Sequence, residues 1–306
     1  MIFALLATLC FACSVLGGGR VARRFGGITA FYIRTGCAFS ALALYGMTFG
    51  HGLAGPGLGA FFLSGAVGFG LGDLALFLAL PRIGSRLSLL LVQCLAAPIA
   101  AAAEWLWLGT VPGRLQLICG AAILAGVGFA LAPDPAAEAA IARHDPRGFR
   151  IGILCGIVAA LGQGIGAVIS RHAWGLDAAV GLHLDGGTAT FQRMLGGGSV
   201  VLLALLISLH RHGSHFVPQR PAATAWKQTW PWLLFAVCAG PLLGVSCYQT
   251  ALAQAPSAVV LAIVATSPLA IIPLSAWIDG DRATRRELIG GVIAVAGVVG
   301  LCVSRS

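Results

Sequence analysis

Long apolar segments separated by short charged connections constrain this chain more than any other feature. An apolar helix of about 20 residues can span a bilayer. Only 9% of the residues are charged and 58% are hydrophobic, which leaves too few charges to cover a water-exposed surface. We therefore predict an all-α polytopic membrane protein with ten transmembrane helices. The apolar segments lie near residues 2–17, 28–50, 57–80, 84–108, 115–132, 151–170, 188–209, 229–253, 256–277 and 286–303.

A short motif occurs twice and divides the chain into two halves. In each half, Gly, Thr, Ala and Arg stand at the same spacing at the start of an apolar segment. An arginine inside an apolar segment is costly in lipid, so its recurrence at one spacing indicates a duplication. The two copies are Gly27, Thr29, Ala30, Arg34 and Gly186, Thr188, Ala189, Arg193.

Further matches extend the duplication along both halves. Ala79, Leu80 and Ser85 match Ala251, Leu252 and Ser257 at a shift of 172 residues, and Pro98 and Gly120 match Pro268 and Gly290 at 170. We predict a first repeat at 1–132, a proline-rich and charged linker at 133–150, and a second repeat at 151–306. Because five helices is an odd number, the repeats are expected to be inverted, as in many secondary transporters.

These motifs resemble the drug/metabolite transporter superfamily, specifically the EamA-like type with ten helices. The resemblance implies a transporter of small metabolites, with export of amino acids or metabolites as the suggested activity. The chain departs from the family pattern between the fourth and fifth helices, where such families often carry an acidic residue. In the second half Asp281 stands near this position, and in the first half Val111 occupies it. The resemblance is carried by Arg34, Arg193, Ala79–Ser85, Ala251–Ser257, Pro98, Pro268, Gly120 and Gly290.

Basic residues are distributed unevenly between the two sets of connections. Alternate connections, beginning with the one after the first helix, hold 14 of the 19 Lys and Arg residues, whereas the other set and the termini hold only Arg114, Arg171 and Arg305. The positive-inside rule then predicts both termini outside the cytoplasm. The resemblance implies the reverse, and we follow the charges. The expected location is the plasma membrane, in particular a bacterial inner membrane.

Two charged residues are expected to meet at one depth in the first half. Arg34 lies about seven residues into its helix and Asp73 about eight residues before the end of the next, so each is roughly 10 Å deep at 1.5 Å per residue. Pairing keeps opposite charges in an apolar medium at least cost. The pair is either a gate or proton-coupling element, or a purely structural ion pair.

The second half lacks this carboxylate, because Val245 stands where the first half has Asp73. Arg193 is therefore expected to lack an acidic partner. An unpaired guanidinium that faces a wet cavity attracts a carboxylate or phosphate, which predicts an anionic or zwitterionic substrate. The alternative is that Arg193 snorkels outward or caps backbone carbonyls.

Other polar residues inside apolar segments extend this candidate substrate pathway. Each must find a partner within the bundle or line water, because lipid offers no hydrogen bonds. Interhelical contact is the default role, and Pro98 and Pro268 are candidate helix kinks or hinges. The further pathway candidates are Gln93, Gln163, Gln192, Tyr248 and Gln249.

The predicted function is secondary active transport by alternating access, as exporter or exchanger, around a central cavity between the repeats. We expect no enzyme activity, cofactor, metal site or nucleic-acid partner; the partners are a small-molecule substrate, the lipid bilayer and protons as coupling ion. One alternative is a non-transporting membrane scaffold or accessory subunit. A remote one is an intramembrane protease, because Gly70–Asp73 spells GxGD, but that chemistry needs a second aspartate inside a helix. Metal binding by His210, His212 and His215 is disfavoured because their connection lacks a fixed geometry.

Overall fold

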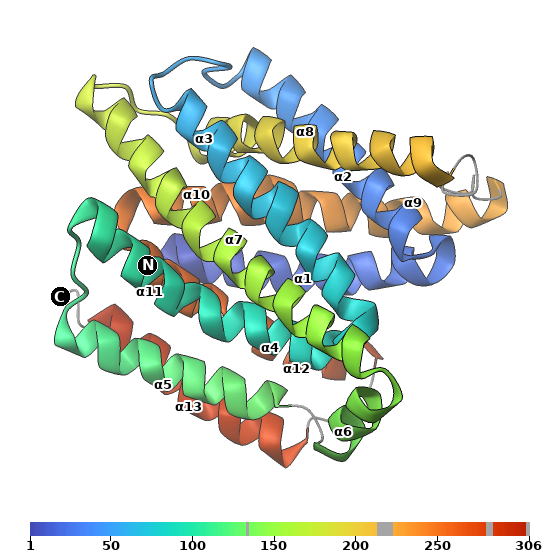
Figure 1. Cartoon of the computed structure of the whole chain (residues 1–306). Coiled ribbons are helices and arrows are strands. Elements are labelled where there is room, and N and C mark those ends of the chain that lie inside the picture. Colours follow the sequence, from blue (N-terminus) through green and yellow to red (C-terminus); the bar gives the residue numbers. More distant parts are fainter. Residues whose placement is uncertain (133–134, 213–222, 280–283, 304–306) are drawn as a thin grey trace.

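The computed structural model describes residues 1–132, 135–212, 223–279 and 284–303, which form a bundle of long helices without a strand among them (Figure 1). Eight helical stretches within these ranges are long and apolar enough to cross a membrane. The predicted all-α polytopic membrane fold is thereby confirmed, since helices satisfy their own backbone hydrogen bonds in lipid. One of these stretches, 58–108, contains a backbone break, and the helix that carries Arg34 is not among the eight; the count of ten stays a prediction.

The first half follows the predicted segments closely. The long helix α1 continues eight residues past its predicted end, and three arginines, at positions 20, 23 and 24, lie in its last turns. The elements are α1 (Ile2–Phe25), α2 (Gly27–Thr48), α3 (Leu58–Gly65), the π-helical η1 (Ala66–Gly72), α4 (Asp73–Leu108) and α5 (Arg114–Leu131).

The second half begins beyond a short helix, α6 (Pro135–His144), that lies in the predicted linker. Its first long helix runs past the predicted segment at both ends, beginning at Pro146, which is tolerated in the first turn of a helix, and ending at Ala179. Asp177, expected in a connection, is therefore buried in the last turn of this helix. The elements are α7 (Pro146–Ala179), α8 (Gly186–His212), α9 (Ala223–Val237), the π-helical η3 (Cys238–Gly244), α10 (Val245–Gln254), α11 (Ser257–Val264), α12 (Ser267–Asp279) and α13 (Arg285–Val303).

The two π-helical segments occupy equivalent places in the two halves. η1 and η3 are each seven residues long and lie 172 residues apart, which is the shift found in the sequence. Asp73 follows η1 directly, and Val245 follows η3. Each is succeeded by a break in the helix, at Gly84 in the first half and before Ser257 in the second. Because π-helical turns are often found at functional sites, η1 and η3 are candidate positions for a functional site.

The break at Gly84 depends on glycine. Its φ of 76° and ψ of 165° fall in a region that L side chains rarely adopt, although a Cβ there would meet no atom within 4 Å. We expect Gly84→Ala to destabilise the protein by about 1–3 kcal/mol through backbone strain alone. Thermal unfolding in detergent measures this. Gly59→Ala, in α3 where a Cβ also meets no atom within 4 Å, is the control and is expected to change the midpoint little; equal midpoints for the two variants would contradict the assignment.

Helices at equivalent positions in the two halves pack antiparallel. In α5 and α13, Gly126 lies against Gly290 while Ile123 lies against Gly297, so the residue numbers run in opposite directions along the contact. The same holds for α2 and α8, whose contacts include Gly46 with Phe191. Figure 1 shows that α1 starts at the end where both termini lie, whereas α7 starts at the opposite end.

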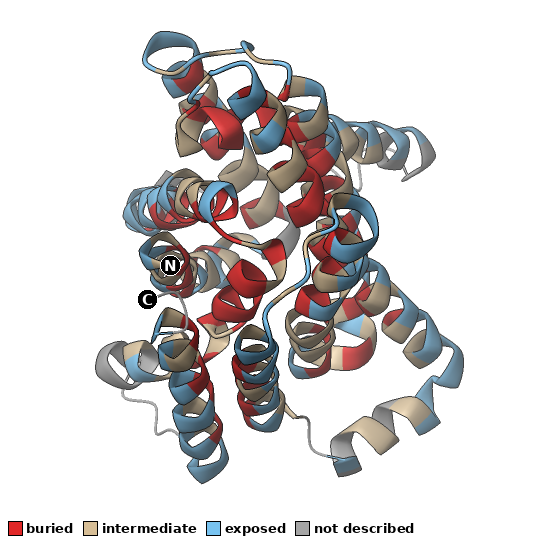
Figure 2. Ribbon diagram, turned by 90° about the vertical axis from the view of Figure 1, so that its left-hand side faces the viewer, coloured by how far each residue is buried: buried red, intermediate tan, exposed pale blue. Residues whose placement is uncertain are grey.

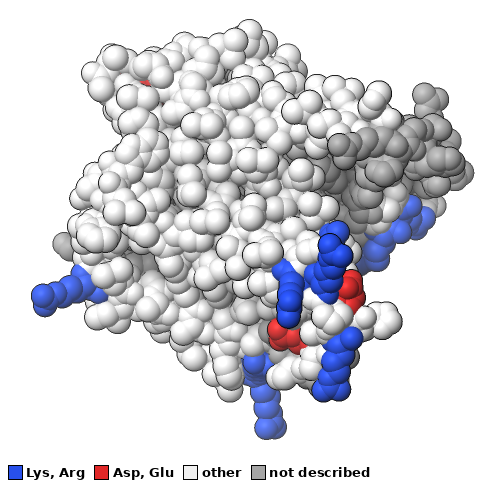
Figure 3. Space-filling model, viewed as in Figure 1, with Lys and Arg blue, Asp and Glu red and all other residues white. Residues whose placement is uncertain are grey.

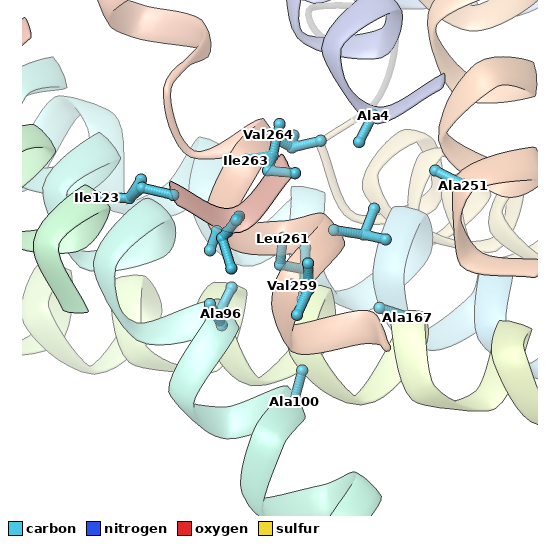
Figure 4. Packing of buried hydrophobic residues seen from close by; sticks show 14 of the residues in the cluster. Ala4, Ala96, Ala100, Ile123, Ala167, Ala251, Val259, Leu261, Ile263 and Val264 are labelled. Carbon is cyan, nitrogen blue, oxygen red and sulfur yellow. The ribbon is translucent and has the colours of Figure 1, made fainter. Parts of the chain in front are cut away.

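The largest apolar cluster surrounds α11, whose residues Val259–Val264 are all buried. Small side chains of α1, α4 and α7 pack against it, so that this helix lies among elements of both halves (Figure 4). Buried residues lie inside the bundle, and its outer faces are exposed (Figure 2). Those faces carry large apolar side chains, such as Leu106 at 78% and Val292 at 71% exposed, as expected for a surface that meets lipid.

The charges divide the bundle into two ends. The ends of α1, α5 and α12 lie opposite the termini, and the Lys and Arg residues on the visible face gather mainly toward that side (Figure 3). We call this the arginine-rich end and the other the terminus end. Most of the remaining visible face is uncharged. This separation of charges between the two ends agrees with the uneven distribution of Lys and Arg among the connections of the sequence.

Candidate functional site

Arg193 of α8 is the most deeply buried cation of the described chain, with 1% of its surface exposed. Its guanidinium packs against two glycines. A Cβ added to Gly68 would stand 2.6 Å from Nη2 of Arg193, and a Cβ added to Gly166 would stand 3.4 Å from the same atom. Gly68 belongs to η1 and Gly166 to α7. The guanidinium is thus held between the first helix of its own half and the π-helical segment of the other half.

Arg34 occupies the equivalent position in the first half. A Cβ on Gly18 would stand 3.5 Å from its Nη1, and one on Gly240 would stand 3.5 Å from its Nη2. Gly18 belongs to α1 and Gly240 to η3. Each arginine therefore reaches from the second helix of its half, past the first, to the opposite π-helical segment, and both reach the centre of the bundle by the same route.

Asp73 lies within electrostatic reach of the guanidiniums of Arg193 and Arg34, but no ion pair joins it to either of them among the described residues. The charged groups that act on its carboxylate are Arg193, more strongly, and Arg34. Asp73 therefore acts on the arginine of the other half as well as on that of its own half. Two cations and one anion leave the centre with a net positive charge.

Aromatic rings complete the surroundings of Arg193. Its Cζ lies 4.6 Å from the ring centroid of Phe69 and 5.6 Å from that of Tyr248. Cation–π contact of this kind stabilises a guanidinium without consuming its N–H donors. Nε of Arg193 and the hydroxyl of Tyr248 are both buried; neither makes a hydrogen bond of good geometry among the described residues, but the two side chains lie close enough to interact with each other.

A buried polar chain adjoins this region through the neighbouring residue Gln249. Its Nε2 donates to Ser170 Oγ at 3.3 Å, Ser170 and Ser64 share a hydrogen bond of 2.7 Å, and Ser64 Oγ donates to the carbonyl of Gly166. Oε1 of Gln249 has no partner. A buried acceptor without a donor costs free energy, so this amide is suited to accept from a solute ammonium group.

The other predicted pathway residues are placed differently. Gln192 is fully buried, but its Nε2 donates to the carbonyls of Gly52 and Ala54 and so fastens the α2–α3 connection. Gln93 and Gln163 are half-buried on α4 and α7. Pro268 lies at the start of α12, just beyond a break after α11. Pro98 is exposed inside α4, whose non-helical backbone is at Gly84 instead.

One ionic cluster was not recognised from the sequence. Glu104 is fully buried and accepts hydrogen bonds from Arg171 at 2.8 Å and from both Ser257 N and Ser257 Oγ at 2.9 Å. It therefore caps the first turn of α11 and joins α4 to α7. The adjacent Trp105 and Trp107 are exposed, as an interfacial belt requires.

Further hydrogen bonds at the terminus end join the two halves. Asp177 accepts from the backbone N–H of Gly57 at 2.7 Å, and the backbone N–H of His51 donates to Thr188 at 3.1 Å. Asp185 accepts from Thr188 and from Tyr45. Burial alone raises the pKa of Asp185, but these hydrogen bonds outweigh it and lower the pKa below its ordinary value. The α2–α3 connection is thereby pinned to α7 and α8.

The family assignment follows from the second half. A family described as EamA-like transporter family matches residues 150–303, which is half of the chain. The chain belongs to this family. It is a transporter family rather than an enzyme family, and the EamA-like chain is accordingly a membrane transporter of the drug/metabolite type.

Comparison with solved structures extends the likeness to the first half. The EamA-like chain is similar to a protein described only as "Crystal structure of protein", with a TM-score of 0.69 and 14% sequence identity, over 99% of this chain and 96% of the other. At this identity the likeness concerns the fold. No curated protein matches the sequence. His215 and Asp281 lie outside the described residues; within the described ones, no group of three or more His, Cys, Asp and Glu side chains could hold a metal ion.

Proposed function

We propose that the chain is a secondary active transporter of small anionic or zwitterionic metabolites, amino acids among them, that works by alternating access. The observation that carries the proposal is the central cluster, in which Asp73 lies within electrostatic reach of Arg193 and Arg34, beside buried polar atoms that make no hydrogen bond among the described residues. Its net positive charge favours a carboxylate. Unpaired donors and acceptors in a buried position favour a solute that can satisfy both.

The residues have distinct roles in this proposal. Arg193 and the hydroxyl of Tyr248 hold the carboxylate of the solute, and Arg34 adds to the positive field. Oε1 of Gln249 accepts from an ammonium group when the solute carries one. Asp73 competes with the solute carboxylate for the guanidiniums, so its protonation releases them and couples transport to protons.

Inversion of the halves supports alternating access. The antiparallel packing of equivalent helices and the two π-helical segments are what two inverted five-helix repeats, 1–132 and 151–306, would produce. The interhalf hydrogen bonds of Asp177, Gln192 and Glu104 close the terminus end in this conformation. The cycle then requires them to separate while a central cavity opens. By charge, the terminus end lies outside the cytoplasm of a plasma membrane.

The test is solute exchange in liposomes that contain the purified protein. Preloaded liposomes are assayed for uptake of labelled neutral amino acids, dicarboxylates and diamines, with and without a pH gradient. Carboxylate-bearing solutes are expected to exchange well above protein-free liposomes, and diamines are not. Asp73→Asn is expected to abolish the response to the pH gradient. Exchange of diamines alone, or of no solute, would contradict the proposal, and the latter result would favour a scaffold.

A further inference from the structure

A second basic site lies at the arginine-rich end, away from the central cluster. A pocket of about 250 Å³ opens between α1 and α9, and none of its six lining residues is acidic. Ligand pockets for drug-sized solutes are larger, about 300–1,000 Å³, so this one suits a small charged group. Its lining residues are Arg20, Arg23, Arg24, Gln228, Thr229 and Trp232.

The walls of this pocket are held in place on both sides. At one side α1 and α9 touch closely, since a Cβ on Gly17 would stand 3.0 Å from Phe235 Cδ1. At the other side Phe25 stacks against Trp226 with ring centroids 5.3 Å apart. Between them, Cζ of Arg20 lies 4.2 Å from the ring centroid of Trp232. These contacts between α1 and α9 therefore define the walls of the pocket.

The position of the pocket indicates the source of its ligand. Trp226, Trp230 and Trp232 are 41%, 50% and 37% exposed along α9, as in the aromatic belts that mark a membrane interface. Arg23 and Arg24 are exposed at the end of α1. Because they line the same pocket as Trp232, they lie close to this membrane interface. Basic pockets between transmembrane helices at such a level bind phosphate headgroups of anionic lipids.

We propose that this pocket binds a phosphate group, supplied by the headgroup of an anionic lipid. Arg23 and Arg24 contact the phosphate oxygens, Arg20 is oriented by its contact with Trp232, and Gln228 and Thr229 offer polar groups to the remainder of the headgroup. Because α1 belongs to the first half and α9 to the second, a lipid bound here bridges the two halves.

Native mass spectrometry of purified protein tests the proposal with phosphatidylglycerol and, for comparison, phosphatidylcholine. The wild type is expected to bind phosphatidylglycerol preferentially, and the Arg23→Gln/Arg24→Gln variant is expected to bind it at least tenfold more weakly. Both side chains are exposed, so the fold is expected to persist, and thermal unfolding checks this. The matched control, Arg147→Gln/Arg150→Gln, removes equal charge at the same end from exposed positions and is expected to keep wild-type affinity.

A second arm separates the two sources of phosphate. Inorganic phosphate and glycerol phosphate are added without lipid; lack of binding identifies the lipid headgroup, whereas binding that displaces phosphatidylglycerol identifies a soluble phosphate ester in the same pocket. Two results overturn the proposal. One is wild-type affinity for phosphatidylglycerol in the pocket variant, and the other is an equal loss in the control variant, which would mean diffuse attraction to basic residues.

Discussion

Arg193→Gln is expected to lower the rate of carboxylate exchange roughly ten- to hundredfold, since a hydrogen bond to a charged group contributes about 1.5–3 kcal/mol. The guanidinium is buried and lies within electrostatic reach of Asp73, and its Nε makes no hydrogen bond among the described residues. Arg193→Lys is expected to exchange at a rate between those of the wild type and Arg193→Gln, because an ammonium group keeps the charge but not the planar fork of donors. Initial rates of exchange in liposomes, per folded protein, are the measurement.

Controls separate a solute-binding role from a structural one. Arg147→Gln removes an exposed arginine and is expected to exchange at the wild-type rate. The Asp73→Asn/Arg193→Gln variant removes opposite charges together and is expected to recover thermal stability without recovering exchange. If Arg193→Gln loses stability but exchanges at the wild-type rate per folded molecule, then Arg193 only holds the helices together and the proposed substrate contact is wrong.

Gly65→Ala is expected to destabilise the protein by about 3 kcal/mol or more, which is the upper end of the usual cost of overpacking. A Cβ at Gly65 would overlap the backbone carbonyl of Arg193 and would stand 3.0 Å from the backbone N of Gly197. Backbone atoms cannot rotate away as a side chain can, so α3 and α8 would have to separate. Thermal unfolding and the yield of monodisperse protein measure the effect.

The same substitution elsewhere on α3 gives the comparison. Gly59→Ala introduces a Cβ with no atom within 4 Å and is expected to leave the unfolding midpoint nearly unchanged. An unfolding midpoint for Gly65→Ala close to that of Gly59→Ala would show that α3 and α8 do not approach as closely as described. Since this contact carries Arg193 to the first half, the geometry of the central cluster would then need revision.

The positions of the helices could be predicted because an apolar segment of sufficient length forms a helix in lipid. The predicted segments agree with the structure where a glycine or proline ends them, as at Gly84 and Pro256. They fail where a helix continues into polar sequence, as at Asp177, because leaving the apolar core does not by itself end a helix. The residues that match at a shift of 172 lie beyond the C-terminal ends of the π-helical segments, and nothing in their composition indicates π geometry.

The central cluster could be predicted only in part. Depth counting placed Arg34 and Asp73 at one level, and polar residues inside apolar helices drew attention to Arg193 and Tyr248. What could not be predicted is which helices cross, since contacts such as Gly68 with Arg193 join different halves. Glu104 was missed for the same reason: its partner Ser257 lies 153 residues away.

Inversion of the two halves is tested most directly by labelling equivalent connections from one side of the membrane. In a background without the native cysteines, Val111→Cys places a thiol in the connection before α5, and Arg285→Cys places one at the first residue of α13, both at exposed positions. A membrane-impermeant maleimide applied to intact cells is expected to label only one of the two, and permeabilised cells are expected to show both. Labelling of both thiols in intact cells, or of neither until permeabilisation, would place the connections on one face and contradict inversion.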